Sequence, residues 1–297
     1  MVNKASWPLH LCYTPWFQES VRTTSYYLFK VFYKTSLEGL DNTRADGPTI
    51  VAPNHTRWSD HLLCGTPLPL HFGMGKVAYF TPAPPGSSWA MRELAHLKML
   101  AMREHGMYPV KRSRDTSPEA VAYTYECYIK PKHHETILKH VQRTLPKDNV
   151  DKLSLLNGPT FTRYLLMMGE LLMWFPQGTR HPEGDAGGAR PGLGQVVLDL
   201  ARDYEVKTVV VPTAILYEKV GGMRPWPPTS GLRGRVRYDR PLEYDDLLEE
   251  YVELKPEKDS PERRRIQQRF SDRVMERVGR MLSEMRDSSA LSQKFCQ

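Results

Sequence analysis

The sequence has no long apolar run. Its most apolar stretch, Tyr164 to Phe175, is interrupted by Gly169 and Glu170, and a membrane-spanning helix needs about 20 apolar residues. The first residues also lack the continuous apolar core and small-residue cleavage site of a secretory signal. We therefore expect neither a transmembrane helix nor a cleaved leader.

Cysteine is scarce as well. The four cysteines are widely scattered and show no paired spacing, at Cys12, Cys64, Cys127 and Cys296. This pattern favours reduced thiols over a disulfide framework or a cysteine-based metal site. The glycine-rich stretch 184–194 lacks both a following Gly-Lys-Ser/Thr and a helix-opening Gly-x-Gly-x-x-Gly, so we expect a flexible connection there rather than a nucleotide site.

The net charge of the 297 residues is +7, but positive and negative residues are unevenly distributed along the chain. Residues 239–253 hold seven acids against one arginine, and residues 255–286 hold ten basic residues against six acids. Basic patches attract any polyanion. The acidic run breaks a basic stripe and no nucleic-acid-binding signature is present, so we expect no nucleic-acid partner.

The pattern after Gly47-Pro48 alternates apolar strand-like runs with helical segments, which predicts parallel βαβ units. The fold class we expect is α/β, with a mostly parallel central sheet flanked by helices and an N-terminal amphipathic helical segment. Helices are predicted near residues 88–103, 118–128, 133–145, 160–168 and 192–203. The domains we expect are an N-terminal segment 1–40, an α/β domain 41–250 with a helical insert 113–170, and a C-terminal helix and tail 251–297.

Two segments allow two interpretations each. The aromatic, basic N-terminal segment suits a membrane interface, but it is equally suited to packing on its own domain. In the last helix, Arg263-Arg264-Arg265 is either a lipid-headgroup patch or a solvated run, and the second is favoured. The apolar stripe that follows, from Ile266 to Met285, predicts a packing face.

Two blocks carry the chemistry. In the first, His55 and Asp60 follow the strand-like run Thr49-Ile50-Val51-Ala52; in the second, Arg180 follows another apolar run. A neutral imidazole can remove a proton from a hydroxyl, and a carboxylate can fix its tautomer and orientation. By itself such a pair is weak evidence, because a core or capping histidine is the commoner case.

Four blocks in a fixed order make the pattern specific. They are Asn54-His55-Thr56-Arg57-Trp58-Ser59-Asp60, Gly106-Met107-Tyr108-Pro109-Val110-Lys111-Arg112, Phe175-Pro176-Gln177-Gly178-Thr179-Arg180 and Val211-Pro212-Thr213. Together they resemble the blocks of the glycerolipid acyltransferase family, which contains the 1-acylglycerol-3-phosphate acyltransferases. The likeness extends over about residues 25–245.

The resemblance implies direct transfer of a fatty acyl group from a thioester to a glycerol hydroxyl. His55 would be the general base and Asp60 would orient it, with no metal, no cofactor and no acyl-enzyme. The residues implied to bind substrate are Asn54, Arg112, Gln177, Gly178, Thr179 and Arg180. Among these, Arg180 and Arg112 would hold the phosphate of the acceptor, where a guanidinium can make two parallel bonds; alternatively, Arg112 could form a surface ion pair with Asp115.

The implied partners are acyl-CoA or acyl carrier protein as donor, a phosphate-bearing glycerol acceptor and a membrane lipid surface. The acceptor we expect is 1-acyl-sn-glycerol 3-phosphate, giving phosphatidic acid in phospholipid biosynthesis. Glycerol 3-phosphate, another lysophospholipid, or a catalytically weak lipid-binding homologue are the alternatives. The expected location is peripheral, on the cytoplasmic face of a membrane.

The chain departs from the family pattern in two ways. Gln177 stands where the third block usually has glutamate, and an amide removes the charge and adds two donors. The second and third blocks are separated by residues 113–174, a longer stretch than we expect for the family. That insert is either a lid over an acyl groove or a peripheral helical addition.

Overall fold

The structure of the chain is a computed structural model. Apart from isolated positions, the residues it describes are 34–43, 47–57, 59–65, 67–68, 72–77, 107–109, 133–151, 158–181, 185–219, 232–254 and 260–294.

A seven-stranded sheet forms the centre of the molecule, with the order β1-β7-β6-β2-β5-β3-β4. Its strands are β1 (Ser36–Glu38), β2 (Thr49–Pro53), β3 (Phe72–Val77), β4 (Met107–Pro109), β5 (Leu171–Trp174), β6 (Val209–Lys219) and β7 (Leu232–Tyr238). All neighbouring strands are parallel except β6 and β7. The predicted fold class, α/β with a mostly parallel sheet, is confirmed.

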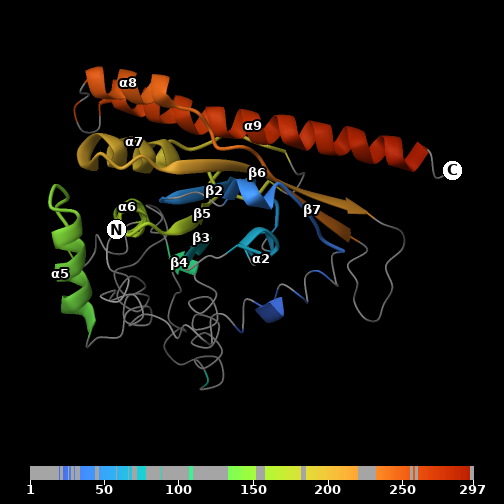
Figure 1. Ribbon diagram of the computed structural model, residues 1–297, viewed down its shortest axis with the longest axis horizontal. Coiled ribbons are helices and arrows are strands. Elements are labelled where there is room, and N and C mark those ends of the chain that lie inside the picture. The colour runs from blue at the N-terminus through green and yellow to red at the C-terminus, as the bar shows by residue number, and fades with distance from the viewer. Residues whose placement is uncertain are drawn as a thin grey trace.

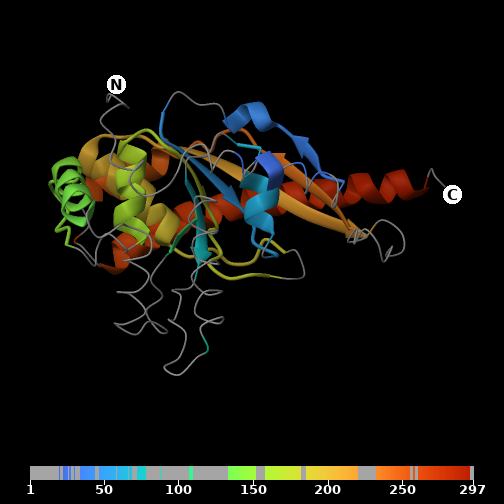
Figure 2. The same ribbon diagram turned by 90° about the horizontal axis from the view of Figure 1, so that it is seen from below.

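Helices cover both faces of this sheet, as Figure 1 shows with α7, α8 and α9 on one side and α2 on the other. Their bounds are α2 (Asp60–Gly65), α5 (His134–Thr144), α6 (Gly158–Met167), α7 (Gly192–Tyr204), α8 (Asp245–Leu254) and α9 (Pro261–Lys294), and a short 3-10 helix, η3, spans Leu40–Thr43. The turned view in Figure 2 shows α9 running the length of the molecule.

Strand β2 shows why two helical layers are needed. Ile50 and Ala52 pack into the core beneath α6, α7 and α9, whereas Val51 packs on the opposite face with residues of α2. Successive strand side chains point to opposite faces, so the apolar run Ile50-Val51-Ala52 is buried on both. The helices predicted at 133–145, 160–168 and 192–203 are confirmed as α5, α6 and α7. Those predicted at 88–103 and 118–128 lie outside the described residues.

The described elements extend beyond the predicted 41–250 domain. Strand β1 precedes residue 41 and nevertheless pairs with β7 in the sheet. Helix α9 packs its predicted apolar stripe onto β6 and α7, and each residue of that stripe is buried. Helix α6, inside the predicted insert, belongs to the main core, so this part of the insert is not a peripheral addition. The predicted N-terminal interfacial segment lies mostly outside the described residues, and its membrane role stays a prediction.

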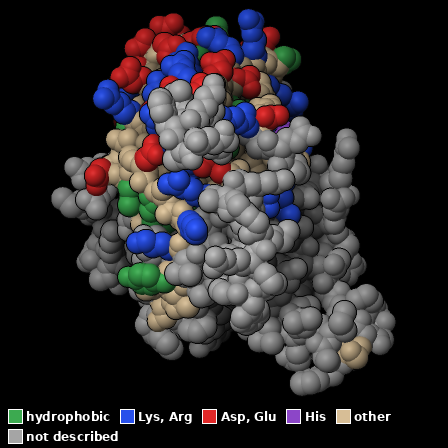
Figure 3. Space-filling view, turned by 90° about the vertical axis from the view of Figure 1, so that its right-hand side faces the viewer, with side chains coloured by type: hydrophobic (Ala, Val, Ile, Leu, Met, Phe, Trp, Pro, Cys, Tyr) green, Lys and Arg blue, Asp and Glu red, His purple; other side chains and the backbone are tan. Residues whose placement is uncertain are grey.

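The basic and acidic runs of the sequence face each other. Acids of the 239–253 run pair with arginines of α9: Asp246 with Arg273, Glu250 with Arg269 and Asp239 with Arg277. Figure 3 shows basic and acidic side chains intermingled over the end of the molecule where α9 finishes. The negative charge of the first run and the positive charge of the second therefore partly neutralise each other.

Arg263 is buried, which neither interpretation of the basic triplet predicted. Its guanidinium donates to Asp199 at 2.7 Å and to the hydroxyl of Tyr251 at 2.7 Å. Only Arg264 and Arg265 of the triplet are exposed. The first arginine of α9 therefore ties α7, α8 and α9 together, since a buried charge needs this pairing to be tolerated.

Helices α7 and α9 approach most closely at Gly194. A Cβ at this position would lie 2.1 Å from the backbone oxygen of Gln267. We expect Gly194→Ala to lower the free energy of unfolding by about 1–3 kcal/mol, because the two helices must move apart. Gly192→Ala in the same helix is the control, since its Cβ would meet nothing closer than 3.4 Å. Equal denaturation midpoints for the two variants would contradict the prediction.

Candidate active site

The predicted site residues that the structure describes follow two neighbouring strands at one edge of the sheet. Asn54 and His55 directly follow β2, and Phe175 directly follows β5, which pairs with β2 in parallel. In the strand order, the chain runs from β2 toward β3 in one direction and from β5 toward β6 in the opposite direction. The carboxyl ends of strands at such a switch point are where open α/β sheets bind ligands.

His55 and Asp60 meet there, as the sequence predicts. Nδ1 of His55 lies 2.9 Å from Oδ2 of Asp60. Because a carboxylate only accepts, the neutral form of the imidazole carries its proton on Nδ1 and its lone pair on Nε2. The histidine side chain is 13% exposed, and Nε2 has no partner among the described residues. An imidazole held in this way can accept a proton at Nε2.

The Asp60 carboxylate is fully buried and held by the turn that precedes it. Its Oδ2 also accepts the backbone N–H groups of Thr56, at 2.5 Å, and Arg57, at 2.7 Å. Its Oδ1 accepts the hydroxyl of Tyr217 at 2.8 Å. These hydrogen bonds hold the carboxylate in the position from which Oδ2 contacts the imidazole.

Three further contacts fix the histidine. The ring of Phe175 lies over the imidazole with the centroids 4.2 Å apart. The backbone N–H of His55 donates to Oε1 of Gln177 at 2.5 Å, and its carbonyl accepts the backbone N–H of His181 at 2.7 Å. The first block is therefore held in place by the amide side chain of Gln177 in the third block and by the backbone of His181, the residue that follows this block.

The amide of Gln177 is used completely by the protein. Besides the bond to His55, Nε2 donates to the carbonyls of Asp185, at 3.1 Å, and Ala186, at 2.5 Å. The side chain is buried, and a carboxylate could not make the last two bonds because it has no donor. Glutamine at this position is therefore specified by the loop that follows it, and its predicted contact with substrate stays a prediction.

Asn54 is also bound within the protein. Its Nδ2 donates to the carbonyl of Ile215 at 3.0 Å, and its Oδ1 accepts the N–H of Ile215 at 2.7 Å. This closed pair clamps the end of β2 to β6. Asn54 thus fixes where the chain leaves the sheet, one residue before His55.

Arg180 is exposed and makes no hydrogen bond or ion pair among the described residues. Arg180 directly precedes His181, whose backbone N–H donates to the carbonyl of His55, so the backbone of Arg180 lies near that histidine. Thr179 is exposed, and Gly178 has a φ of 73°, a backbone conformation that glycine adopts readily. Arg112 lies outside the described residues.

The nearby thiol is not a nucleophile in this state. Cys64 is fully buried, and burial raises the pKa of its thiol to about 12. It therefore stays protonated near neutral pH, and the thiolate is the reactive form. Among the described residues no cluster of three or more His, Cys, Asp or Glu side chains could hold a metal ion.

Residues 34–216 match the sequence model of the Acyltransferase family, a range that includes the imidazole–carboxylate pair and Arg180. The chain belongs to the Acyltransferase family. No curated protein matches the chain. A similar solved structure is that of the 1-acyl-sn-glycerophosphate (LPA) acyltransferase PlsC from Thermotoga maritima, at 14% sequence identity and a TM-score of 0.45, covering 96% of this chain and 84% of that chain.

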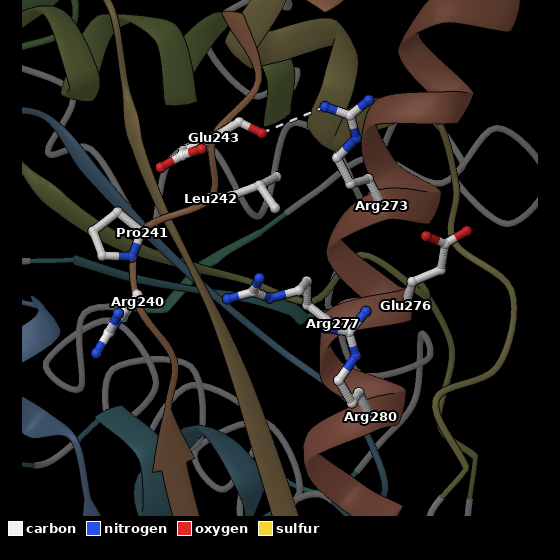
Figure 4. Close-up of a pocket in the computed structure, with 8 residues that line it drawn as sticks. All are labelled: Arg240, Pro241, Leu242, Glu243, Arg273, Glu276, Arg277 and Arg280. Carbon is white, nitrogen blue, oxygen red and sulfur yellow. Dashed lines mark hydrogen bonds between the residues drawn. The ribbon is translucent and has the colours of Figure 1, made fainter.

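This member of the Acyltransferase family also has a groove of about 430 Å³ between α9 and the segment after β7, shown in Figure 4. Its lining includes the four arginines Arg240, Arg273, Arg277 and Arg280 and the two glutamates Glu243 and Glu276. Two further carboxylates bind the arginines from outside the lining. Asp246 pairs with Arg273, which lowers its pKa to about 2, and Asp239 pairs with Arg277. The four arginines are thus matched by four carboxylates, so the groove has no excess positive charge to attract an anion.

None of the described helices is both long and apolar enough to cross a membrane. The residues that the sequence reasoning missed are Tyr217 and His181. His181 directly follows the third block, and a longer block would have included it. Tyr217 lies in β6, outside all four blocks, and no sequence signal connects it with Asp60.

Proposed function

We propose that this protein transfers a fatty acyl group from acyl-CoA or acyl carrier protein to a hydroxyl of 1-acyl-sn-glycerol 3-phosphate, giving phosphatidic acid. One observation carries the proposal: a buried carboxylate holds an imidazole whose second nitrogen is available, in a chain of the Acyltransferase family. The exposed guanidinium of Arg180 supports an acceptor that bears a phosphate.

This geometry supports the following reaction. As the acceptor oxygen attacks the thioester carbonyl carbon, Nε2 of His55 takes the hydroxyl proton. Asp60 stabilises the imidazolium that forms. The tetrahedral intermediate then collapses, the C–S bond breaks, and the imidazolium returns the proton to the leaving thiolate. One ester and one thiol replace the alcohol and the thioester.

The proposed place of action is the cytoplasmic face of a membrane, which the protein would reach peripherally. An acceptor and product with acyl chains reside in lipid, and the aromatic, basic N-terminal sequence suits an interface.

The test is an acyl-transfer assay on the purified protein with both donors and a panel of acceptors. The panel contains lysophosphatidic acid, glycerol 3-phosphate and lysophospholipids with larger headgroups, and the products are identified by mass spectrometry. Phosphatidic acid should form fastest. Faster acylation of another acceptor would reassign the substrate, and no acylation of any acceptor would refute the proposal.

Arg180→Ala should raise the KM for the phosphate-bearing acceptor about 10- to 100-fold, because a charge-assisted bond to the phosphate is lost. The KM for the donor should change little. Arg143→Ala is the control, since this arginine is also exposed but lies on α5. If both variants keep the parent KM, Arg180 does not bind the acceptor.

A further inference from the structure

Tyr217 touches the orienting carboxylate from a strand far away in sequence. It lies in β6, 157 positions after Asp60, and its hydroxyl donates to Oδ1 of Asp60 at 2.8 Å. This is the carboxylate oxygen that His55 does not use, because the imidazole binds Oδ2. The other donor to Oδ1 is the hydroxyl of Thr56, at 3.2 Å. The tyrosine therefore makes the shorter of these two contacts to Oδ1.

Ser59 extends this contact into a chain of hydrogen bonds. Its hydroxyl lies 3.1 Å from the hydroxyl of Tyr217. A phenol has one proton, and Tyr217 gives it to the carboxylate, so Ser59 must donate to the tyrosine oxygen. The chain runs from Ser59 through Tyr217 to Asp60 and His55. Successive hydrogen bonds in a buried setting polarise one another, and Ser59 and Asp60 are both buried.

The ring of Tyr217 holds the same turn from a second direction. The guanidinium carbon of Arg57 lies 5.0 Å from the ring centroid, within the range of a cation–π contact. The backbone N–H of Arg57 binds Oδ2 of Asp60. One side chain of β6 thus contacts the turn at Arg57, at Ser59 and at Asp60.

We propose that Tyr217 is a positioning residue for the imidazole–carboxylate pair. It fixes the rotation of the Asp60 carboxylate, and through it the orientation of His55, so that Nε2 faces the acceptor hydroxyl. The proposal rests on the proposed function for its kinetic consequence, although the geometry of the pair can be measured without turnover.

The chain offers a matched control in Tyr238. This buried tyrosine of β7 donates its hydroxyl at 2.8 Å to the carbonyl of Cys64. Cys64 and Asp60 are both in α2, so each tyrosine donates a hydrogen bond of 2.8 Å to the same helix. Only the bond of Tyr217 reaches the carboxylate. Loss of either hydroxyl should lower the stability of the protein, and only the loss at Tyr217 should affect catalysis.

The experiment compares Tyr217→Phe and Tyr238→Phe with the parent. Tyr217→Phe should lower kcat about 10- to 100-fold, the range expected for one hydrogen bond to a charged group. KM for donor and acceptor should stay near the parent values. Tyr238→Phe should leave kcat unchanged. In proton NMR, the Nδ1–H signal of His55, assigned by its loss in His55→Ala, should move in Tyr217→Phe and not in Tyr238→Phe.

A parent-like kcat and an unmoved His55 signal in Tyr217→Phe would overturn the proposal, as would an equal loss of kcat in Tyr238→Phe. If Tyr217→Phe does not fold, Ser59→Ala decides: it should lower kcat and move the signal, and an unchanged variant overturns the chain of hydrogen bonds. An inactive parent would refute the proposed function, whereas the NMR comparison would still judge Tyr217.

Discussion

Replacing His55 with alanine is expected to lower kcat for acyl transfer by about 100- to 10,000-fold, the range for losing a general base. Nε2 of the imidazole has no partner among the described residues, and Asp60 holds the ring through Nδ1. Without it, the acceptor hydroxyl must lose its proton to water while it attacks. KM for both substrates should change much less, because the loss falls on the transition state.

His140→Ala is a suitable comparison for this variant. His140 lies in α5 and its Nδ1 is 3.0 Å from the hydroxyl of Tyr164, so its loss removes a histidine without touching the site. The measurement is the initial rate of product formation with saturating donor and acceptor. If His55→Ala acylates the acceptor as fast as His140→Ala does, the imidazole is not the base and the mechanism is wrong.

Gln177→Glu should lower the free energy of unfolding at pH 7 by about 3–5 kcal/mol, comparable to leaving a buried charge unpaired. The amide now donates to the carbonyls of Asp185 and Ala186. An ionised carboxylate would face these two oxygens with no proton to offer, in a position that is buried. We therefore expect this variant to lose activity through instability, although it restores the residue usual in the family.

The loss of stability in Gln177→Glu should depend on pH. Burial beside two carbonyls raises the folded-state pKa of the introduced carboxyl above its unfolded value of about 4.3. The penalty should be small below that pH, where the carboxyl is protonated and can donate one bond. It should grow as the pH rises through the raised value. Chemical denaturation at several pH values measures it.

Gln142→Glu is the comparison for this substitution. Its Nε2 also donates to a carbonyl, that of Val150, at 2.9 Å, but Gln142 is exposed, so a carboxylate there stays hydrated. A Gln177→Glu variant as stable as Gln142→Glu would show that the loop tolerates the charge. If Gln177→Glu were active and the parent inactive, the chain would be a lipid-binding homologue that has lost its chemistry.

Local pattern was enough to predict much of the fold and the pairing of His55 with Asp60. Apolar runs identified β2, β5 and β6, and helical spacing identified α5, α6 and α7. The pair could be predicted because both members lie in one turn, only five positions apart. The resemblance to a family added Arg180 and the order of the blocks.

The rest depends on contacts between distant segments. Tyr217 reaches Asp60 only because β6 runs beside β2 in the sheet, and an isolated tyrosine in a strand carries no sign of this. The burial of Arg263 depends on Asp199, 64 positions earlier. The two carbonyls that favour an amide at position 177 are backbone groups of Asp185 and Ala186. Every residue has such a carbonyl, so the sequence does not show which ones face Gln177.

The family match ends at residue 216, in the middle of β6. Strand β7 and helix α9 follow that point, yet Ala214 and Leu216 are covered by Met275, Val278 and Leu282 of α9. A protein trimmed to the matched range would expose one side of the strand whose Tyr217 steadies the reaction centre, and would lose that tyrosine too. We therefore expect a chain trimmed to residues 34–216 to be less stable than one that keeps β7 and α9.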